Sequence, residues 1–353
     1  MNKLQYKNME LKTYKYELKL KDTFRISHTA RDSQETLIVA LSHGGFTGYG
    51  EAAATSYYGV TVEGMSRTIK QLEPLISANI EKTPEELWEI LNPHFGKNSF
   101  AQCALDIAMN DLHGKRLGLP LYKLWGLDLK ELPLSNYTIG IDSVERMVQK
   151  MQAFPWPLYK IKLGTEDDVQ IVRELRKYSD AIFRVDANGA WTAEQTIENS
   201  KALKELQVEF IEQPLPASDT DGMTEVYKHS VLPVIADESC IHESDVAKCA
   251  PYFHGVNVKL TKCGGLTPAR RMIAEARSLG LQVMVGCMTE STIGLSAIGQ
   301  LLPMLDYVDM DGEMLITNDI ANGVKVRDGR TIFPETNGTG AELTIFKDEL
   351  KHE

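Results

Sequence analysis

The sequence predicts an α/β protein built on a barrel of eight parallel strands, together with a second domain of the α+β type. Two observations predict the barrel. Between residues 158 and 265, short runs rich in Val and Ile each end in a charged residue, as buried parallel strands do when each delivers a functional group at its carboxyl end. These charged residues recur every 22 to 26 residues, which fits one strand plus one helix per unit, at Lys162, Asp186, Glu212, Asp237 and Lys259.

The length of the chain indicates two domains. Its 353 residues are too many for most single compact domains, and a parallel α/β barrel takes about 250 of them. We therefore expect an α+β capping domain over residues 1–130, the barrel over 131–314 and a C-terminal tail over 315–353. The tail is broken by turn-rich stretches such as NDIANG and PETNGTG, and we expect it to pack back on the capping domain.

The first 130 residues show strand patterns and then helical ones. Residues 9–20 and 34–42 alternate or run apolar, and a Gly-Gly turn leads into a third strand, FTGYGEA. The polar stretch between the first two strands, residues 22–33, is expected to be a loop. Helical periodicity follows at 62–77, 84–91 and 99–116. Ser99 and Gln102 have the spacing of a capping box at the start of the last helix.

The repeating α/β pattern opens with a strand at 132–140. Two later strands, at 281–287 and 307–312, bring the total to eight. Helical patterns separate the strands at 169–178, 194–206, 223–229, 243–249, 268–279 and 293–303. Because eight strands close a ring, the charged residues at their carboxyl ends are expected to converge on one face of the barrel.

Composition excludes several classes of partner. The formal charge of −11 is spread over scattered acidic residues, which argues against nucleic acid and anionic membranes. No apolar stretch approaches the roughly 18 residues of a membrane span, and the first ten residues lack the apolar core of a secretory signal. We expect a cytoplasmic protein. The five cysteines are odd in number and widely spaced, which predicts reduced thiols.

Asp186, Glu212 and Asp237 stand at three successive strand ends. Three carboxylates in one pocket repel each other strongly unless a cation lies among them. A set of oxygen ligands without His or Cys favours a hard ion, Mg²⁺ first and Mn²⁺ as a substitute. The alternative is that these residues are helix N-caps or loop charges.

Lysines flank these carboxylates. Lys160 and Lys162 lie two apart on one strand, so their side chains share a face, and Lys259 ends a strand on the other side. Beside another ammonium group and a divalent cation, a buried lysine loses proton affinity and suits a general base. Two opposed lysines with a metal between them suit removal of a proton next to a carboxylate and its return on the other face. Spacing alone leaves Lys262 open as the second base, and a structural ion-pair network is the alternative.

Asp309 and Asp311 share one face at the end of the last strand. A second acidic pair, away from the first three carboxylates, predicts a site for a cation on the substrate, such as an ammonium group. The alternative is a solvated Asp-Gly turn. No histidine lies at a predicted strand end and no G-x-G-x-x-G follows a strand, so zinc and dinucleotide sites lose support. Cys287, at the end of the seventh strand, is interpreted as a small wall residue.

These residues lie in motifs that resemble the enolase superfamily, in its muconate-lactonizing-enzyme subgroup, and most of all its dipeptide epimerases. The motifs are KIK at 160–162, DANGAW at 186–191, EQP at 212–214, ADES at 236–239 and KLTKCGG at 259–265. The resemblance implies a (β/α)7β TIM-type barrel with a capping domain formed by the N-terminal region and the C-terminal tail. It also implies a homo-oligomer with one Mg²⁺ per subunit.

The resemblance assigns roles to the candidate residues. Asp186, Glu212 and Asp237 match the metal ligands, Lys162 and Lys259 the paired acid/base lysines, and Lys160 a residue that assists the enolate. Asp309 and Asp311 resemble the pair that holds the free α-ammonium of a dipeptide whose C-terminal residue is epimerised. Cycloisomerases, o-succinylbenzoate synthases and N-acylamino acid racemases share the scaffold and remain the alternative.

The C-terminal residue of an L-Ala-Xaa dipeptide is the open part of this prediction. In relatives that act on alanyl-glutamate, an arginine of the loop after the first strand pairs with the glutamate. The corresponding place here is near Thr29, flanked by Arg25 and Arg31. We expect Phe24, Ile26 and Thr29 to line a pocket for a small or apolar residue, as in Ala-Ala or Ala-Val. Thr138, in the first barrel strand, is a further substrate-binding candidate.

Overall fold

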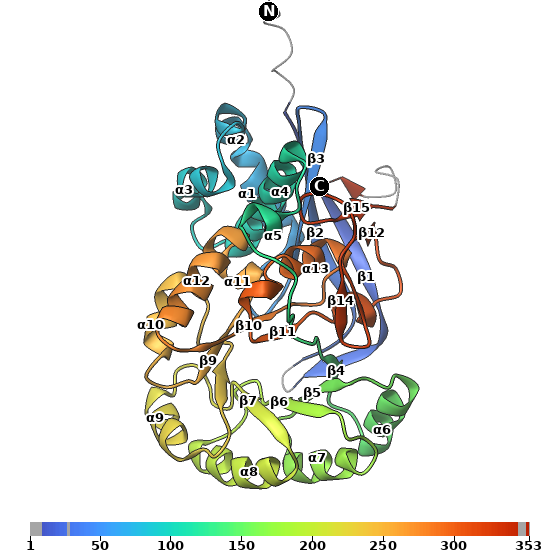
Figure 1. Cartoon of the computed structure of the whole chain (residues 1–353), viewed down its shortest axis with the longest axis vertical. Helices are drawn as coiled ribbons and strands as arrows, with labels where there is room; N and C mark the ends of the chain where they lie inside the picture. The colour runs from blue at the N-terminus through green and yellow to red at the C-terminus, as the bar shows by residue number, and fades with distance from the viewer. Residues whose placement is uncertain (1–8, 27–28, 345–350, 353) are drawn as a thin grey trace, which may run out of the picture.

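The structure, a computed structural model, describes residues 9–26, 29–344 and 351–352. It contains a four-stranded antiparallel sheet packed against helices and a separate sheet of eight parallel strands (Figure 1). No helix in this described part is both long enough and apolar enough to cross a lipid bilayer.

The antiparallel sheet has the order β16-β1-β2-β3. Its strands are β1 (Glu10–Ile26), β2 (Thr29–His43), β3 (Phe46–Ala53) and β16 (Lys351–His352). The helices that follow β3 are α1 (Val62–Gln71), α2 (Glu73–Asn79), α3 (Pro84–Phe95), α4 (Ser99–Leu117) and α5 (Leu121–Leu124). Helix α4 lies directly on β3, because a Cβ atom at Gly50 would come within 1.9 Å of the Ala104 carbonyl oxygen. Only glycine allows the two backbones to approach so closely.

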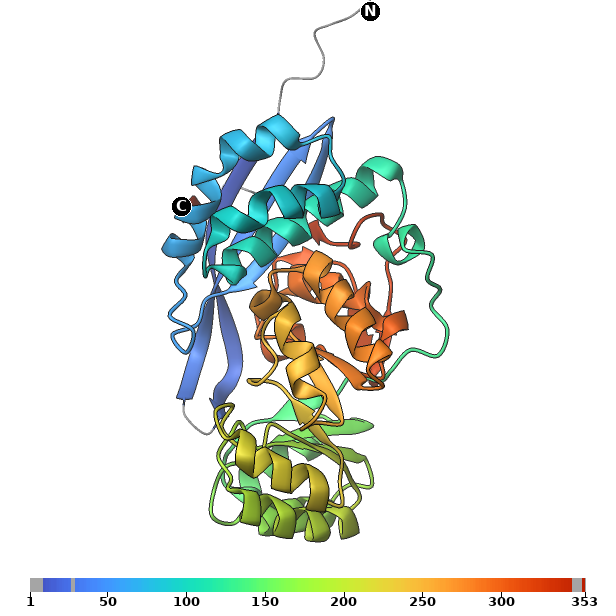
Figure 2. The ribbon, with the colours of Figure 1, turned by 90° about the vertical axis from the view of Figure 1, so that its left-hand side faces the viewer.

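Two predictions in this region are wrong. Residues 22–33 were expected to form a loop, but β1 and β2 continue as a paired hairpin, with Phe24 opposite Arg31 after a register shift (Figure 2). In such a two-stranded ribbon the backbone N–H and C=O groups are satisfied by pairing between the strands. Its side chains can therefore stay polar, and the alternation of apolar and polar residues that indicates a strand is weak. The N-cap of α4 is Asn98 rather than Ser99, since the Asn98 side chain accepts a hydrogen bond from the Ala101 amide.

The eight parallel strands follow one another in chain order, as predicted. They are β4 (Tyr137–Ile139), β5 (Leu158–Lys162), β6 (Ile182–Asp186), β7 (Val208–Glu212), β8 (Val234–Ala236), β9 (Gly255–Val258), β10 (Gln282–Gly286) and β11 (Tyr307–Asp309). A parallel bridge between Ser135 and Val308 joins the last strand to the segment before the first and closes the ring. The predicted α/β barrel of eight parallel strands is therefore confirmed.

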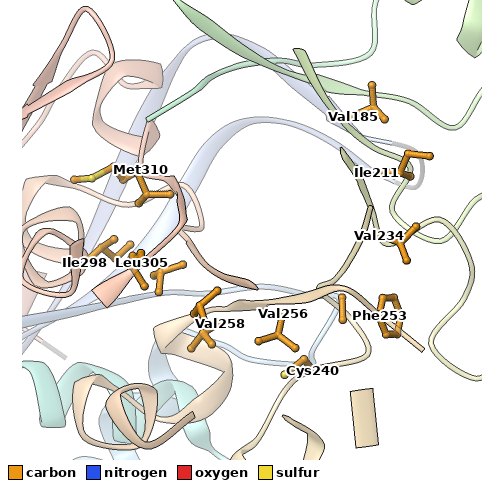
Figure 3. Packing of buried hydrophobic residues seen from close by; sticks show 14 of the residues in the cluster. Val185, Ile211, Val234, Cys240, Phe253, Val256, Val258, Ile298, Leu305 and Met310 are labelled. Carbon is orange, nitrogen blue, oxygen red and sulfur yellow. The ribbon is translucent and has the colours of Figure 1, made fainter. Parts of the chain in front are cut away.

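Helices cover the outside of this ring (Figure 1). They are α6 (Val144–Ala153), α7 (Asp168–Arg176), α8 (Ala193–Glu205), α9 (Thr220–His229), α10 (Glu243–Cys249), α11 (Leu260–Cys263), α12 (Leu266–Ser278) and α13 (Thr292–Gly299). A continuous apolar layer fills the space between strands and helices (Figure 3). Val185 and Ile211 belong to this layer, so their neighbours Asp186 and Glu212 point to the inside of the ring.

The segment after β11 returns to the antiparallel sheet and its helices. It includes the 3-10 helix η2 (Gly312–Leu315) and the short strands β12 (Ala321–Asn322), β13 (Lys325–Arg327), β14 (Arg330–Ile332) and β15 (Glu342–Leu343). The Thr317 amide donates to the Lys19 carbonyl at 2.8 Å, and the Thr339 amide donates to the Asp111 carboxylate at 2.8 Å. These contacts tie the tail to β1 and to α4.

Candidate active site

Three carboxylates meet at the carboxyl end of the barrel. Asp186 ends β6, Glu212 ends β7 and Asp237 directly follows β8. Asp186 lies opposite Glu212 in the register of the sheet. One carboxylate oxygen from each of the three lies within 4.8 Å of the others, and all three side chains are buried. The structure thus brings together the three acidic residues singled out in the sequence.

Lys160 and Lys162 extend from β5 toward these carboxylates. The Lys160 Nζ lies 2.7 Å from Glu212 Oε2, 3.2 Å from Asp186 Oδ2 and 2.9 Å from Asp309 Oδ2. The Lys162 Nζ donates to Asp186 Oδ2 at 2.6 Å. The two lysines of this strand therefore share Asp186, and Lys160 also pairs with Glu212 and Asp309.

Lys259 approaches from the other side of the ring. It directly follows β9, and its Nζ lies 2.8 Å from Asp237 Oδ2. Since β5 and β9 are four positions apart in a ring of eight strands, Lys162 and Lys259 face each other across the barrel. Both line the same pocket.

Lys262 occupies a different position. Its Nζ is buried and donates to Asp237 Oδ1 at 2.6 Å and to the Cys240 carbonyl at 3.1 Å. It is not among the residues that line the pocket in the described part of the chain. The structure therefore separates two lysines that sequence spacing could not distinguish.

The charges of the site shift the pKa values of its members. Burial opposes ionisation of Asp186, but the ammonium groups of Lys162 and Lys160 hold its pKa below the ordinary value. Burial and the neighbouring Asp186 charge raise the pKa of Glu212. For Lys259, burial lowers the pKa, but the Asp237 carboxylate outweighs it and the net direction is upward. The protein groups alone therefore do not produce the low pKa that a general base at Lys259 requires.

The three carboxylates suit a hard divalent cation. The donor set is all oxygen, converges within one coordination sphere and lies at buried positions, which fits Mg²⁺ or Mn²⁺. Cys287, Asp309 and Asp311 also bring ligand atoms within 4.8 Å of one another. In that second group, however, a lysine and an amide already occupy Asp309.

The acidic pair at the end of β11 lies on the wall of the same pocket. Asp309 accepts hydrogen bonds from Lys160 Nζ at 2.9 Å and from Asn136 Nδ2 at 2.8 Å. Asp311 accepts from the Thr138 amide at 2.5 Å. Burial and the Asp309 charge raise the pKa of Asp311 to about 7. No lysine or arginine of the described residues forms an ion pair with Asp311, which makes the acidic pair receptive to a ligand cation.

The antiparallel part of the molecule supplies another part of the pocket wall. Its contributions are Phe24, Arg31, Thr55, Tyr57 and Tyr58. The two tyrosines were missed in the sequence, because their loop faces the site only once the sheet has docked on the barrel. Asn188 and Glu238, which also line the pocket, were missed although each lies within two residues of a predicted carboxylate.

The residues that the sequence predicts to set substrate specificity lie in different environments. Phe24 lines the pocket, whereas Arg25 is exposed and its carbonyl accepts from the Ile141 amide. The side chains of Ile26 and Thr29 lie outside the described residues. Thr138 lines the pocket, and so does Cys287, whose place fits the predicted wall residue.

Arg31 also reaches the pocket. Its Nη2 donates to Thr289 Oγ1 at 2.9 Å, and its guanidinium lies over the Phe24 ring at 5.8 Å. Burial lowers the pKa of Arg31. Within the described part of the chain Arg31 forms no ion pair with a carboxylate, and its Nε is buried without a hydrogen-bond partner. The pocket therefore contains an arginine that can bind an anionic group.

Comparison with known proteins places this geometry in a family. Residues 142–347 match the family described as enolase C-terminal domain-like, and residues 8–126 match the mandelate racemase / muconate lactonizing enzyme, N-terminal domain. An L-Ala-D/L-amino acid epimerase from Flavobacterium johnsoniae is 54% identical over 335 residues, covering 95% of this chain and 100% of the relative. An enzyme of the same name from Maribacter sp. is 56% identical over 336 residues, covering 95% and 99%.

A solved structure extends the likeness to three dimensions. The dipeptide epimerase from Enterococcus faecalis V583, complexed with Mg and the dipeptide L-Leu-L-Tyr, superposes with a TM-score of 0.87. It is 29% identical in sequence, and the match covers 96% of this chain and 99% of that one.

Asp311→Asn is expected to stabilise the protein more at pH 8 than at pH 5. The native carboxyl has a pKa of about 7, whereas an unfolded aspartate ionises near pH 4, so stability falls as pH rises through this window and stays lower above it. Asparagine does not ionise and removes this loss, by an amount on the order of 2 kcal/mol. Urea unfolding of EDTA-treated protein at both pH values measures it. Asp328→Asn, the same change on an exposed turn, is the control, and an equal effect of Asp311→Asn at both pH values contradicts the prediction.

Proposed function

The chain belongs to the mandelate racemase / muconate lactonizing enzyme family of enolase-like proteins, and we propose that it is a Mg²⁺-dependent dipeptide epimerase. The proposed reaction inverts the α-carbon of the C-terminal residue of L-Ala-Xaa dipeptides. The observation that carries the proposal is a pair of opposed lysines, Lys162 and Lys259, on the two sides of a carboxylate trio. The curated relatives that share more than half of its residues carry the name L-Ala-D/L-amino acid epimerase.

Asp186, Glu212 and Asp237 would hold the metal ion. Their oxygen donors converge and are buried, and the relative from Enterococcus faecalis is described with Mg. When bound, Mg²⁺ supplies the positive charge that makes an enolate accessible near neutral pH. The same carboxylate oxygens accept hydrogen bonds from Lys162 and Lys259, so a bound cation would compete with both lysines for them and would weaken the attraction that raises the pKa of Lys259.

Lys162 and Lys259 would exchange protons with the two faces of the α-carbon. One neutral lysine takes the α-proton, and the opposite lysine, as an ammonium group, gives a proton to the other face. Lys160 lies between Asp186, Glu212 and Asp309, where its charge would assist the developing enolate. Among the described residues Lys262 does not line the pocket, and its Nζ is held by Asp237 and the Cys240 carbonyl, which supports Lys259 as the second base.

Asp309 and Asp311 would bind the α-ammonium group of the dipeptide. Both carboxylates line the pocket, and a ligand ammonium would offset the cost of placing two like charges together. Thr138 supports this site, since its amide holds Asp311 in place. Cycloisomerases and o-succinylbenzoate synthases act on substrates without an amine, so this pair favours the epimerase over those alternatives.

Arg31 bears on the C-terminal residue of the substrate. Phe24 suits an apolar side chain, as the sequence also predicts for Ile26 and Thr29, whereas Arg31, which forms no ion pair among the described residues, brings a cation to the pocket wall. We therefore propose that the pocket accepts apolar residues and that Arg31 adds acceptance of an acidic one.

In deuterated buffer with Mg²⁺, the protein is expected to exchange the α-hydrogen of Xaa in at least one L-Ala-Xaa dipeptide and to yield both epimers. Lys162→Ala and Lys259→Ala should each lower epimerisation by about 10²- to 10⁴-fold, the range for loss of a general acid or base. Proton NMR follows both events, and Lys201→Ala, on the exposed face of α8, is the control. If no dipeptide in the panel exchanges, the substrate is sought instead among amine-free carboxylates and N-acyl amino acids.

Millimolar Mg²⁺ is expected to raise the melting temperature of the wild type and to have little effect on Glu212→Gln. A ligand that binds only the native state stabilises it by about 2.7 kcal/mol at a hundred times its Kd. Differential scanning fluorimetry with and without Mg²⁺ measures the shift, with Glu225→Gln on the exposed helix α9 as the matched control. Equal shifts for the wild type and for Glu212→Gln would place the bound ion elsewhere.

Arg31→Met is expected to lower kcat/KM for L-Ala-L-Glu by about tenfold or more relative to the nearly isosteric L-Ala-L-Gln, since a charge-assisted hydrogen bond contributes roughly 1.5–3 kcal/mol. Coupled assays on the two dipeptides give the ratio directly. Arg25→Met, at an exposed position of the same hairpin, should leave the ratio unchanged. A ratio that is the same in the wild type and in Arg31→Met removes Arg31 from substrate selection.

A further inference from the structure

One carboxylate of the pocket has no part in the mechanism above. Glu238 follows Asp237 and lines the pocket beside the two lysines. Its Oε1 accepts a hydrogen bond from Asn188 Nδ2 at 3.2 Å. Its Oε2 is buried and has no hydrogen-bond partner in the described part of the chain. A buried carboxylate oxygen without a partner costs stability, so the presence of Glu238 at the pocket wall indicates a functional role.

Asn188 connects this carboxylate to Lys162. While its Nδ2 donates to Glu238, its Oδ1 accepts from Lys162 Nζ at 3.3 Å, and its backbone amide donates to Asp186 Oδ1 at 2.9 Å. The residue has a φ of 46°, in the left-handed region that non-glycine residues seldom adopt. The backbone thus holds the side chain between a carboxylate and an ammonium group.

The two partners of Asn188 require one orientation of its amide. An ionised carboxylate can only accept hydrogen bonds, and an ammonium group can only donate them. The NH₂ end must therefore face Glu238 and the oxygen must face Lys162. Without Glu238, no contact among the described residues holds the NH₂ end on that side, and the amide could turn its donors toward the lone pair of neutral Lys162.

We propose that Glu238 is a positioning residue that, through Asn188, orients the Lys162 Nζ for its half of the proton transfer. This inference rests on the proposed two-lysine epimerisation. In that step the α C–H bond breaks, its electron pair stays on the substrate, and the proton forms a new N–H bond on neutral Lys162. By accepting one N–H of Lys162, the Asn188 oxygen fixes the orientation of the Lys162 Nζ. The lone pair of neutral Lys162, or a free N–H of its ammonium form, then points toward the substrate.

Lys259 has a different set of contacts. Its Nζ donates to Asp237 Oδ2 at 2.8 Å, and among the described residues no side-chain amide links it to Glu238 by hydrogen bonds. Loss of the hydrogen bond from Asn188 should therefore affect the proton transfers at Lys162, whereas Lys259 senses only the charge of Glu238, which Glu238→Gln also removes. A general loosening of the site would affect both.

The test follows α-hydrogen exchange in D₂O separately from each epimer of the dipeptide that the wild type turns over best. Lys162→Ala identifies the epimer whose exchange depends on Lys162. Glu238→Met, which has no acceptor, is expected to slow exchange of that epimer by about tenfold to a hundredfold, the scale of a small misplacement of a catalytic group. The other epimer should still exchange at a rate within about twofold of wild type, because Lys259 can return deuterium to the face that it deprotonated. Fewer of these exchange events should end in inversion, because inversion needs a proton from Lys162.

Companion variants separate the hydrogen bond from other effects. Glu238→Gln keeps an acceptor for Asn188 and should retain most of the exchange from both epimers. Asn188→Gly accepts the positive φ and should reproduce the one-sided defect of Glu238→Met, which provides a second route if Glu238→Met does not fold. Glu225→Gln, on exposed α9, should behave as the wild type.

Equal slowing of both epimers by Glu238→Met and Asn188→Gly, or no slowing by either, would overturn the proposal. So would a loss in Glu238→Gln as large as that in Glu238→Met. A wild type that exchanges no dipeptide at all refutes the proposed function instead, and the two failures are thereby distinguished.

Discussion

The balance of charge inside the barrel mouth is the constraint on which the site depends. In the described part of the chain, this region gathers six carboxylates, at Asp186, Glu212, Asp237, Glu238, Asp309 and Asp311, and four lysines, at Lys160, Lys162, Lys259 and Lys262. Most of these side chains are buried, where an unpaired charge costs several kcal/mol. Each lysine therefore has a fixed carboxylate partner, and the excess of negative charge matches what a divalent cation and a cationic ligand would neutralise.

The alternation of side chains along the strands is what allows this concentration of charge. On the outer face of each strand, residues such as Val185, Ile211 and Val256 pack against the helices in one continuous apolar layer (Figure 3). That layer fixes the register, so the residues next to them point inward at set heights. The apolar packing outside the ring thus holds in place the charged groups within it.

Much of the fold and most of the charged site could be predicted from the sequence, because strand alternation and the near-constant spacing of βα units are local patterns. The long β1–β2 hairpin could not, since its exposed ribbon has a weak alternation and gains stability from backbone pairing. Asn188 was missed because its role depends on a positive φ after β6. Tyr57 and Tyr58 reach the pocket only through docking of two distant parts of the chain, which no local pattern encodes.

The division of the pocket wall between two parts of the molecule has an evolutionary consequence. The carboxylates and lysines of the site lie at or just after the strand ends of the barrel, whereas Phe24, Arg31 and Tyr58 come from the antiparallel sheet and its connections. Mutations in the latter can therefore alter the shape and charge presented to a ligand while the ion-pair network stays intact. During evolution, substitutions in the antiparallel part can therefore change which ligands the pocket accepts, while the barrel residues of the site are inherited unchanged.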